Sequence, residues 1–189
     1  MRYGTLALRL IGGLALGLIG AFFLAAGAAS AQGIQGVFAS SNMEVYGGYT
    51  YFRFYQAPHL AANLNGLNFS AQYFPRNWIA LDGEVVGAFG SQAATNTRFF
   101  MGVAGPRIRW STSHGIDVWA HAMGGATYFS PQTPYGSQEA FAFEAGGGVD
   151  LSPPHRRIAL RMSGDLVGTT YFSTYQFSPK VSAGLVFKF

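Results

Sequence analysis

The chain has 189 residues, which is enough for one domain and a targeting segment. Only 11% of its residues are charged, against about a quarter in a typical soluble domain. The formal net charge of +4 comes without a clustered basic run, which argues against nucleic-acid binding, and the lack of cysteine excludes a small disulfide-stapled scaffold.

The first 31 residues predict a cleaved signal peptide. Arg2 and Arg9 flank the start of an apolar run that continues to Ala28, and Ala29 and Ala31 have the small side chains that signal peptidase accepts. The run is also near the length of a transmembrane anchor, but an anchor would lack the small-residue exit. Cleavage after Ala31 would remove two arginines and lower the net charge from +4 to +2.

After residue 31, stretches of roughly ten residues with period-two alternation recur, and no sustained helical period appears. We predict a short periplasmic segment over residues 32–42 and a barrel domain over 43–189. Each alternating stretch has a length near the roughly nine to eleven residues with which a tilted strand crosses a membrane. The eight predicted strands are Met43–Phe54, Gly66–Phe74, Trp78–Ala88, Arg98–Trp110, Asp117–Phe129, Ala140–Leu151, Ile158–Phe172 and Pro179–Phe189.

The breaks between these stretches alternate in length, as in outer-membrane barrels with short periplasmic turns and longer external loops. The short breaks are Pro75–Asn77, Ser111–Ile116 and Ser152–Arg157. The breaks predicted as external loops, and as the place of any ligand contact, are Tyr55–Asn65, Phe89–Thr97, Ser130–Glu139 and Ser173–Ser178. The fold class predicted is therefore all-β, an eight-stranded antiparallel up-and-down transmembrane barrel.

The last predicted strand separates most clearly into two faces. One face carries Val181, Ala183, Leu185, Phe187 and Phe189. The other face is small or cationic apart from one valine. Such a strand fits lipid on its apolar side and a polar lumen on the other.

The same alternation on other strands places acidic and basic side chains together in one interior. An eight-stranded barrel is narrow enough for side chains to fill it, and buried charges must pair. We therefore predict a lumenal salt-bridge network without a continuous pore. Its predicted members are Glu44, Asp82, Glu84, Arg107, Arg109, His121, Glu144, Asp150, Arg161 and Asp165.

Aromatic residues cluster near the predicted strand ends, where they would include the two interfacial girdles. The set is Tyr46, Tyr49, Tyr51, Phe52, Tyr73, Phe74, Trp78, Trp110, Trp119, Tyr128, Phe129, Tyr171 and Phe172.

Several segments resemble the OmpA-like and OmpX-like family of small outer-membrane barrels, in a form typical of acidobacteria. They are Glu44–Tyr51, Asn63–Asn68, Ala80–Glu84, Gly105–Arg107, Ala120–Gly125, Gly146–Asp150, Ile158–Arg161 and Phe177–Phe189. The resemblance implies residence in the bacterial outer membrane, contact with its lipid and lipopolysaccharide, and a monomer. It also implies that Phe189, with Phe187, Leu185 and Ala183 on one face, is the signal read by the barrel-assembly machinery.

Catalytic, metal and cofactor chemistry are not predicted. The four histidines are scattered and lack ligand spacing, and His121 is expected to bond to acidic neighbours inside the barrel. A lipid-modifying enzyme would need a serine, a histidine and an acid together near the outer rim, where Ser130 and Ser173 are the candidate serines and His59 the candidate histidine. A narrow channel would use Arg107 and Arg109 as an anion filter, unless Asp82 and Glu84 neutralise them.

A soluble lipocalin-like carrier remains a further alternative, with an apolar inside and a polar outside. The function expected is a non-enzymatic outer-membrane barrel with a structural or surface-interaction role.

Overall fold

The computed structural model describes residues 42–57, 60–92, 95–130, 139–153, 157–171 and 175–189. The predicted signal peptide, including Ala29 and Ala31, lies outside the described residues. Among the described residues, no helix has the length and apolar character needed to span a membrane.

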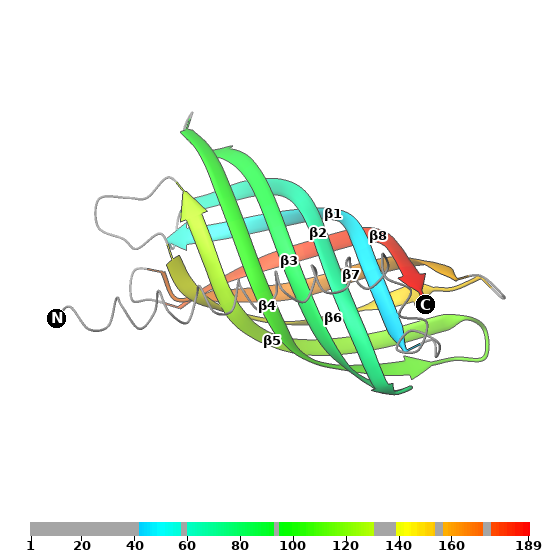
Figure 1. Cartoon of the computed structure of the whole chain (residues 1–189). Coiled ribbons are helices and arrows are strands. Elements are labelled where there is room, and N and C mark those ends of the chain that lie inside the picture. Colours follow the sequence, from blue (N-terminus) through cyan, green and yellow to red (C-terminus); the bar gives the residue numbers. More distant parts are fainter. Residues whose placement is uncertain (1–41, 58–59, 93–94, 131–138, 154–156, 172–174) are drawn as a thin grey trace, which may run out of the picture.

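Eight antiparallel strands form one closed barrel in which each strand pairs with its neighbours in sequence (Figure 1). The strands are β1 Met43–Ala57, β2 Leu60–Arg76, β3 Ile79–Gln92, β4 Thr95–Ser111, β5 Ile116–Ser130, β6 Glu139–Leu151, β7 Ile158–Thr169 and β8 Gln176–Lys188. The barrel closes where β1 pairs with β8, with Glu44 opposite Lys188 and Phe52 opposite Lys180. The predicted fold class is confirmed.

Period-two alternation decides which side chains face the lumen and which face outward. On β8 the outward row includes Val181, Leu185 and Phe187, which are 44–51% exposed, whereas Lys180 and Val186 are buried. A row of large apolar side chains on the outer face is unfavourable in water and favourable against lipid, because the transfer of apolar surface out of water lowers the free energy. The two predicted faces of this strand are confirmed.

Several strands are longer than predicted, and two of the predicted external loops are wrong. The range Tyr55–Asn65 is mostly strand, since β1 continues to Ala57 and β2 begins at Leu60. Likewise β3 continues to Gln92 and β4 begins at Thr95. Below, the end of the barrel at which β1 begins and β8 ends is called the terminal end. The opposite end is called the far end.

The missed strand residues lie at the far end, where the polarity of the two faces is inverted. Arg53, Asn63 and Arg98 point outward and are exposed, whereas the neighbouring Phe54 and Phe99 point inward and are buried. Outward amides and cations with apolar partners inside are typical of a barrel section surrounded by water. Of these outward polar residues, Asn63 lies in a range predicted as a loop, whereas Arg53 and Arg98 lie at the ends of predicted strands.

The structure also corrects the predicted aromatic girdles. Six of the thirteen aromatic residues face the lumen: Tyr46, Phe52, Phe74, Trp119, Phe129 and Tyr171. Tyr49, Tyr73, Trp78 and Trp110 are exposed on the outer face, as girdle residues would be. Phe172 lies outside the described residues.

Inward aromatic rings fill the lumen near the far end, and we call them the aromatic plug: Phe52, Phe54, Phe99, Phe129 and Tyr171. Their ring centroids lie 4.8–6.0 Å apart in a connected set. They belong to one buried apolar cluster with Leu64, Met101 and other small or branched side chains. The far half of the lumen is therefore packed like a hydrophobic core.

Some glycines permit the close approach of neighbouring strands that this narrow barrel requires. A Cβ atom on Gly66 would clash with the backbone carbonyl oxygen of Gly87, only 1.9 Å away, and with the Cα atom of Ala88. At Gly83, by contrast, an added Cβ would meet nothing within 4 Å. Gly66 is thus a structural requirement of the sheet, whereas Gly83 is not.

We therefore expect Gly66→Ala to lower the free energy of unfolding by about 1–3 kcal/mol, the usual cost of overpacking. Gly83→Ala is the matched control and should stay within about 0.5 kcal/mol of the parent, as exposed substitutions do. Urea-induced unfolding in detergent micelles would measure both. Equal stability of the two variants would contradict the assigned strand contact.

The lumenal ion network

Nearly all acidic residues of the chain are inside the barrel. Seven of the eight aspartates and glutamates are buried, namely Glu44, Asp82, Glu84, Asp117, Glu144, Asp150 and Asp165. Facing them in the lumen are Arg107, Arg109, Arg161, Lys180 and Lys188, together with His121. These thirteen residues are called the ion network below, and with Gln72 they come from all eight strands.

The ten residues predicted for this network all face the lumen, and the structure brings them into one connected set. Sequence reasoning left out Lys180, Lys188 and Asp117. The alternation of side chains along the strands could have identified all three residues. The lysines occupy the inward row of the last strand, and Asp117 shares its parity with His121 on β5.

At the terminal end, two cations bind two carboxylates. Arg109 Nη1 lies 2.5 Å from Glu44 Oε1, and its Nε donates to the backbone carbonyl of Asn77. Lys188 Nζ lies 2.9 Å from Asp117 Oδ2 and 3.8 Å from Glu44 Oε1. Lys188 and Arg109 are partly exposed, so this layer is the boundary between the network and solvent.

The next layer contains two buried arginines stacked against one indole ring. Arg161 donates through Nε and Nη2 to the two oxygens of Asp150, each at 2.7 Å, which is the bidentate geometry that suits a guanidinium best. Arg107 donates to Asp82, and its guanidinium carbon lies 3.8 Å from the Trp119 ring centroid. Trp119 Nε1 in turn donates to Asp150 Oδ1 at 3.0 Å.

Gln72 links these two ion pairs. Its Nε2 donates to Asp82 Oδ1 at 2.9 Å, and its Oε1 accepts from Arg161 Nη1 at 3.1 Å. Because both ends of the amide are used, the two arginine–aspartate pairs are held in one fixed arrangement.

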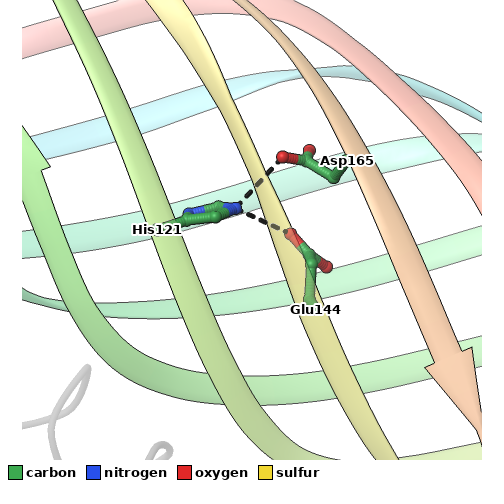
Figure 2. Close-up of side chains that lie close together, drawn as sticks. All are labelled: His121, Glu144 and Asp165. Carbon is green, nitrogen blue, oxygen red and sulfur yellow. Dashed lines mark hydrogen bonds and ion pairs between the residues drawn. The ribbon is translucent and has the colours of Figure 1, made fainter.

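Deepest in the lumen, His121 and Lys180 share two carboxylates, those of Glu144 and Asp165. His121 Nε2 lies 3.0 Å from Asp165 Oδ1 and 3.4 Å from Glu144 Oε1, as Figure 2 shows, and His121 Nδ1 lies 3.4 Å from Asp82 Oδ2. Lys180 Nζ contacts Glu84, Glu144 Oε1 at 2.9 Å and Asp165 Oδ2 at 3.5 Å. This layer adjoins the apolar cluster of the far half.

One predicted pairing is wrong. Asp82 does pair with Arg107, but Glu84 does not neutralise Arg109. Glu84 lies nearer the far end and pairs with Lys180 across the lumen, whereas Arg109 reaches Glu44 on β1. Contacts across the narrow lumen have replaced the pairing expected between adjacent strands.

His114 does not join the network. It lies in the turn before β5 beside Ser113, with 3.4 Å between Nδ1 and Oγ, while His59 and His155 lie outside the described residues. Of the serines considered for catalysis, Ser130 ends β5 at the far end, and Ser173 lies outside the described residues. Among described residues, no serine, histidine and acid come together at the far end.

A closed barrel with an apolar outer face and an ionic interior defines the class: an eight-stranded β-barrel of the transmembrane type. Solved structures of small outer-membrane barrels share this fold. Neisserial surface protein A matches with a TM-score of 0.64 and 14% identity, over 78% of this chain and 97% of that one. The attachment invasion locus protein Ail of Yersinia pestis matches with a TM-score of 0.55 and 16% identity, over 79% and 100%.

The outer membrane enzyme PagL also matches, with a TM-score of 0.51 and 12% identity over 76% of this chain and 97% of that one. No protein-family model and no curated protein sequence matches the chain. The chain therefore has the fold of the small outer-membrane barrels, and at least one protein of that fold is an enzyme.

Removing one partner of a buried ion pair leaves an uncompensated charge. We expect Arg107→Met to lower the free energy of unfolding by about 3–5 kcal/mol. Adding Asp82→Asn should recover part of this loss, because the orphaned carboxylate is then neutral. Arg98→Met is the control, since Arg98 is on the same strand but exposed.

Urea titrations in micelles would give all four stabilities. Equal losses for Arg107→Met and Arg98→Met would show that the ion network does not hold the barrel together.

Proposed function

We propose that this protein is a non-enzymatic, non-conducting integral barrel of the bacterial outer membrane, with a structural or surface-interaction role at its far end. The observation that carries this proposal is the partition of side chains, with apolar residues outward and nearly all acids paired inside. The far end, where β1 to β4 extend into the section of inverted polarity, would face the cell exterior, and the terminal end the periplasm.

The partition argues against a soluble lipocalin-like carrier. Such a carrier would have an apolar cavity and a polar exterior. Here Leu81, Phe141 and Met162 are 51–59% exposed on the outer face, while Asp82 and Arg161 are buried inside. Only the far-end section resembles a soluble barrel, and its interior is occupied by the aromatic plug.

Two barriers in series argue against a solute channel. The ion network crosses the lumen, with Arg161 joining Asp150, Glu44 and Gln72 on three other strands. Farther along, the aromatic plug fills the lumen with rings in mutual contact. An anion filter at Arg107 is disfavoured because its guanidinium is engaged by Asp82 and Trp119.

The inverted far-end section is the part best suited to contact molecules outside the membrane. A strand needs roughly nine to eleven residues to cross the hydrocarbon, whereas β2 and β4 have 17 each. The far ends of β1, β2 and β4 carry the outward side chains of Arg53, Asn63 and Arg98. Surface contact would then depend on rigid strand hairpins more than on the long loops predicted from sequence.

The alternative that this protein is an enzyme is supported by the likeness of fold alone. PagL shows that a barrel of this shape can be an enzyme. In the part of this chain that the structure describes, His121 is enclosed by carboxylates in the lumen, remote from any serine at the far end. We therefore place the role in surface contact.

We expect the purified protein to produce no conductance steps in planar lipid bilayers, because both barriers cross its lumen. A variant with Phe54→Ala, Phe99→Ala and Phe129→Ala should unfold at lower urea concentration, since each large-to-small change in a packed core costs about 3–5 kcal/mol. Regular conductance steps from the folded parent protein would reject the closed lumen.

Lipid and lipopolysaccharide contact, a monomeric state and recognition by the barrel-assembly machinery are further parts of the proposal. Ala183, Leu185, Phe187 and Phe189 all point outward at the end of the chain, where an assembly factor could reach them. Their arrangement as one apolar row supports a sorting signal.

We expect Phe189→Ser to reduce the amount of folded barrel in the outer-membrane fraction of a Gram-negative host. Phe177→Ser is the matched control, because Phe177 lies on the same face of β8 and is 50% exposed, against 51% for Phe189. Heat-dependent gel mobility of the fractionated membranes would count the folded form. Equal yields would reject the sorting role, and absence of the parent protein from that fraction would reject the localisation.

A further inference from the structure

The deepest layer of the lumen contains three metal-ligating groups from three different strands. His121 on β5, Glu144 on β6 and Asp165 on β7 each offer one donor atom, and these atoms lie within 4.8 Å of one another. Figure 2 shows the imidazole Nε2 directed at both carboxylates. All three side chains are 1% exposed or less.

The separations of these donors match a coordination sphere. Zinc is held at about 2.0–2.2 Å by histidine nitrogen and carboxylate oxygen, so tetrahedral donors lie about 3.4 Å apart. His121 Nε2 lies 3.4 Å from Glu144 Oε1 and 3.0 Å from Asp165 Oδ1. The two carboxylate oxygens lie within 4.8 Å of each other, so small side-chain movements would let one ion contact all three atoms.

The charges of the lumen point to a cation independently of this geometry. The ion network holds seven carboxylates against five lysine and arginine side chains. The excess is local, because Asp82 is paired with Arg107, whereas Glu84, Glu144 and Asp165 share one ammonium group, that of Lys180. His121 also faces two of these carboxylates, and as a metal ligand its imidazole must be neutral. Two negative charges then remain uncompensated in a closed interior, and one divalent ion would balance them.

A buried atom without a partner supports the same conclusion. Glu144 Oε2 is buried and has no hydrogen-bond partner, whereas Glu144 Oε1 is contacted by both His121 and Lys180. A bound ion would use this carboxylate fully. Lys180 would keep its contact with Glu84 and compete less for Glu144 and Asp165.

We propose that His121, Glu144 and Asp165 form a binding site for one divalent transition-metal ion, with zinc as the best match. The mixed nitrogen and oxygen donor set suits zinc better than magnesium or calcium, which prefer oxygen alone. The ion would link β5, β6 and β7 on the terminal-end side of the aromatic plug. Since the ligands come from separate strands, no short sequence spacing reveals the site.

The test is zinc loading during refolding, because the packed lumen restricts later access. The protein is unfolded in urea with a chelator, refolded into detergent micelles with zinc, and passed over a chelating resin. Elemental analysis then gives the zinc bound per chain, and heat-dependent gel mobility verifies folding. Asp165→Asn and Glu144→Gln each remove one ligand charge, and Asp150→Asn is the matched control in the arginine layer of the network.

We expect about one zinc ion per chain in the parent protein and in Asp150→Asn. The affinity for zinc should fall at least about tenfold in Asp165→Asn and Glu144→Gln. Losses of this size follow even from substitutions of residues that only hydrogen-bond to the metal ligands. Magnesium should compete weakly. Zinc X-ray absorption of the parent should show one imidazole with oxygen ligands at about 2.0–2.2 Å.

Three results would overturn the site. They are no retained zinc in the folded parent, equal retention in all variants, or absorption spectra dominated by several imidazoles. The last two would assign the ion to the other histidines. If a ligand variant fails to fold, the stoichiometry and absorption spectrum of the parent still decide.

Discussion

Burial of ionised groups in a lumen too narrow for bulk water is the constraint on which this structure depends. Each carboxylate must meet a cation, and the partners come from strands on different sides of the barrel. Arg161, for example, joins β7 to β1, β2 and β6 through Glu44, Gln72 and Asp150. The charges can therefore be satisfied only when the barrel closes, which couples electrostatics to topology.

Along the barrel axis, the interior changes from ionic to apolar, and the exterior changes in the opposite sense. Near the terminal end, Asp82 and Arg161 are inside and Leu81 is outside. Near the far end, Phe54 is inside and Arg53 outside. One fold thus joins a membrane section to a section suited to water, and the crossover marks where the strands would leave the hydrocarbon.

The fold by itself leaves the biological role open, because similar barrels include the enzyme PagL and the attachment invasion locus protein Ail. What distinguishes this chain is the filling of its lumen. A packed aromatic plug and a nearly complete ion network favour rigidity over transport. The crowded layer around His121 is the one place where chemistry beyond structural support is concentrated.

The sequence alone determined the strand count, the antiparallel order and the two faces of strands such as β8, because period-two alternation records which side is buried. Parity also placed ten charged residues in the lumen. Phe52 shares its parity with Glu44, and Phe129 with His121, so their inward direction could also be read from the sequence, although both were predicted for the girdles. Parity could not pair Glu84 with Lys180 or bring His121 to Glu144. Those contacts cross the lumen, and only the curvature and register of the closed barrel fix their distances.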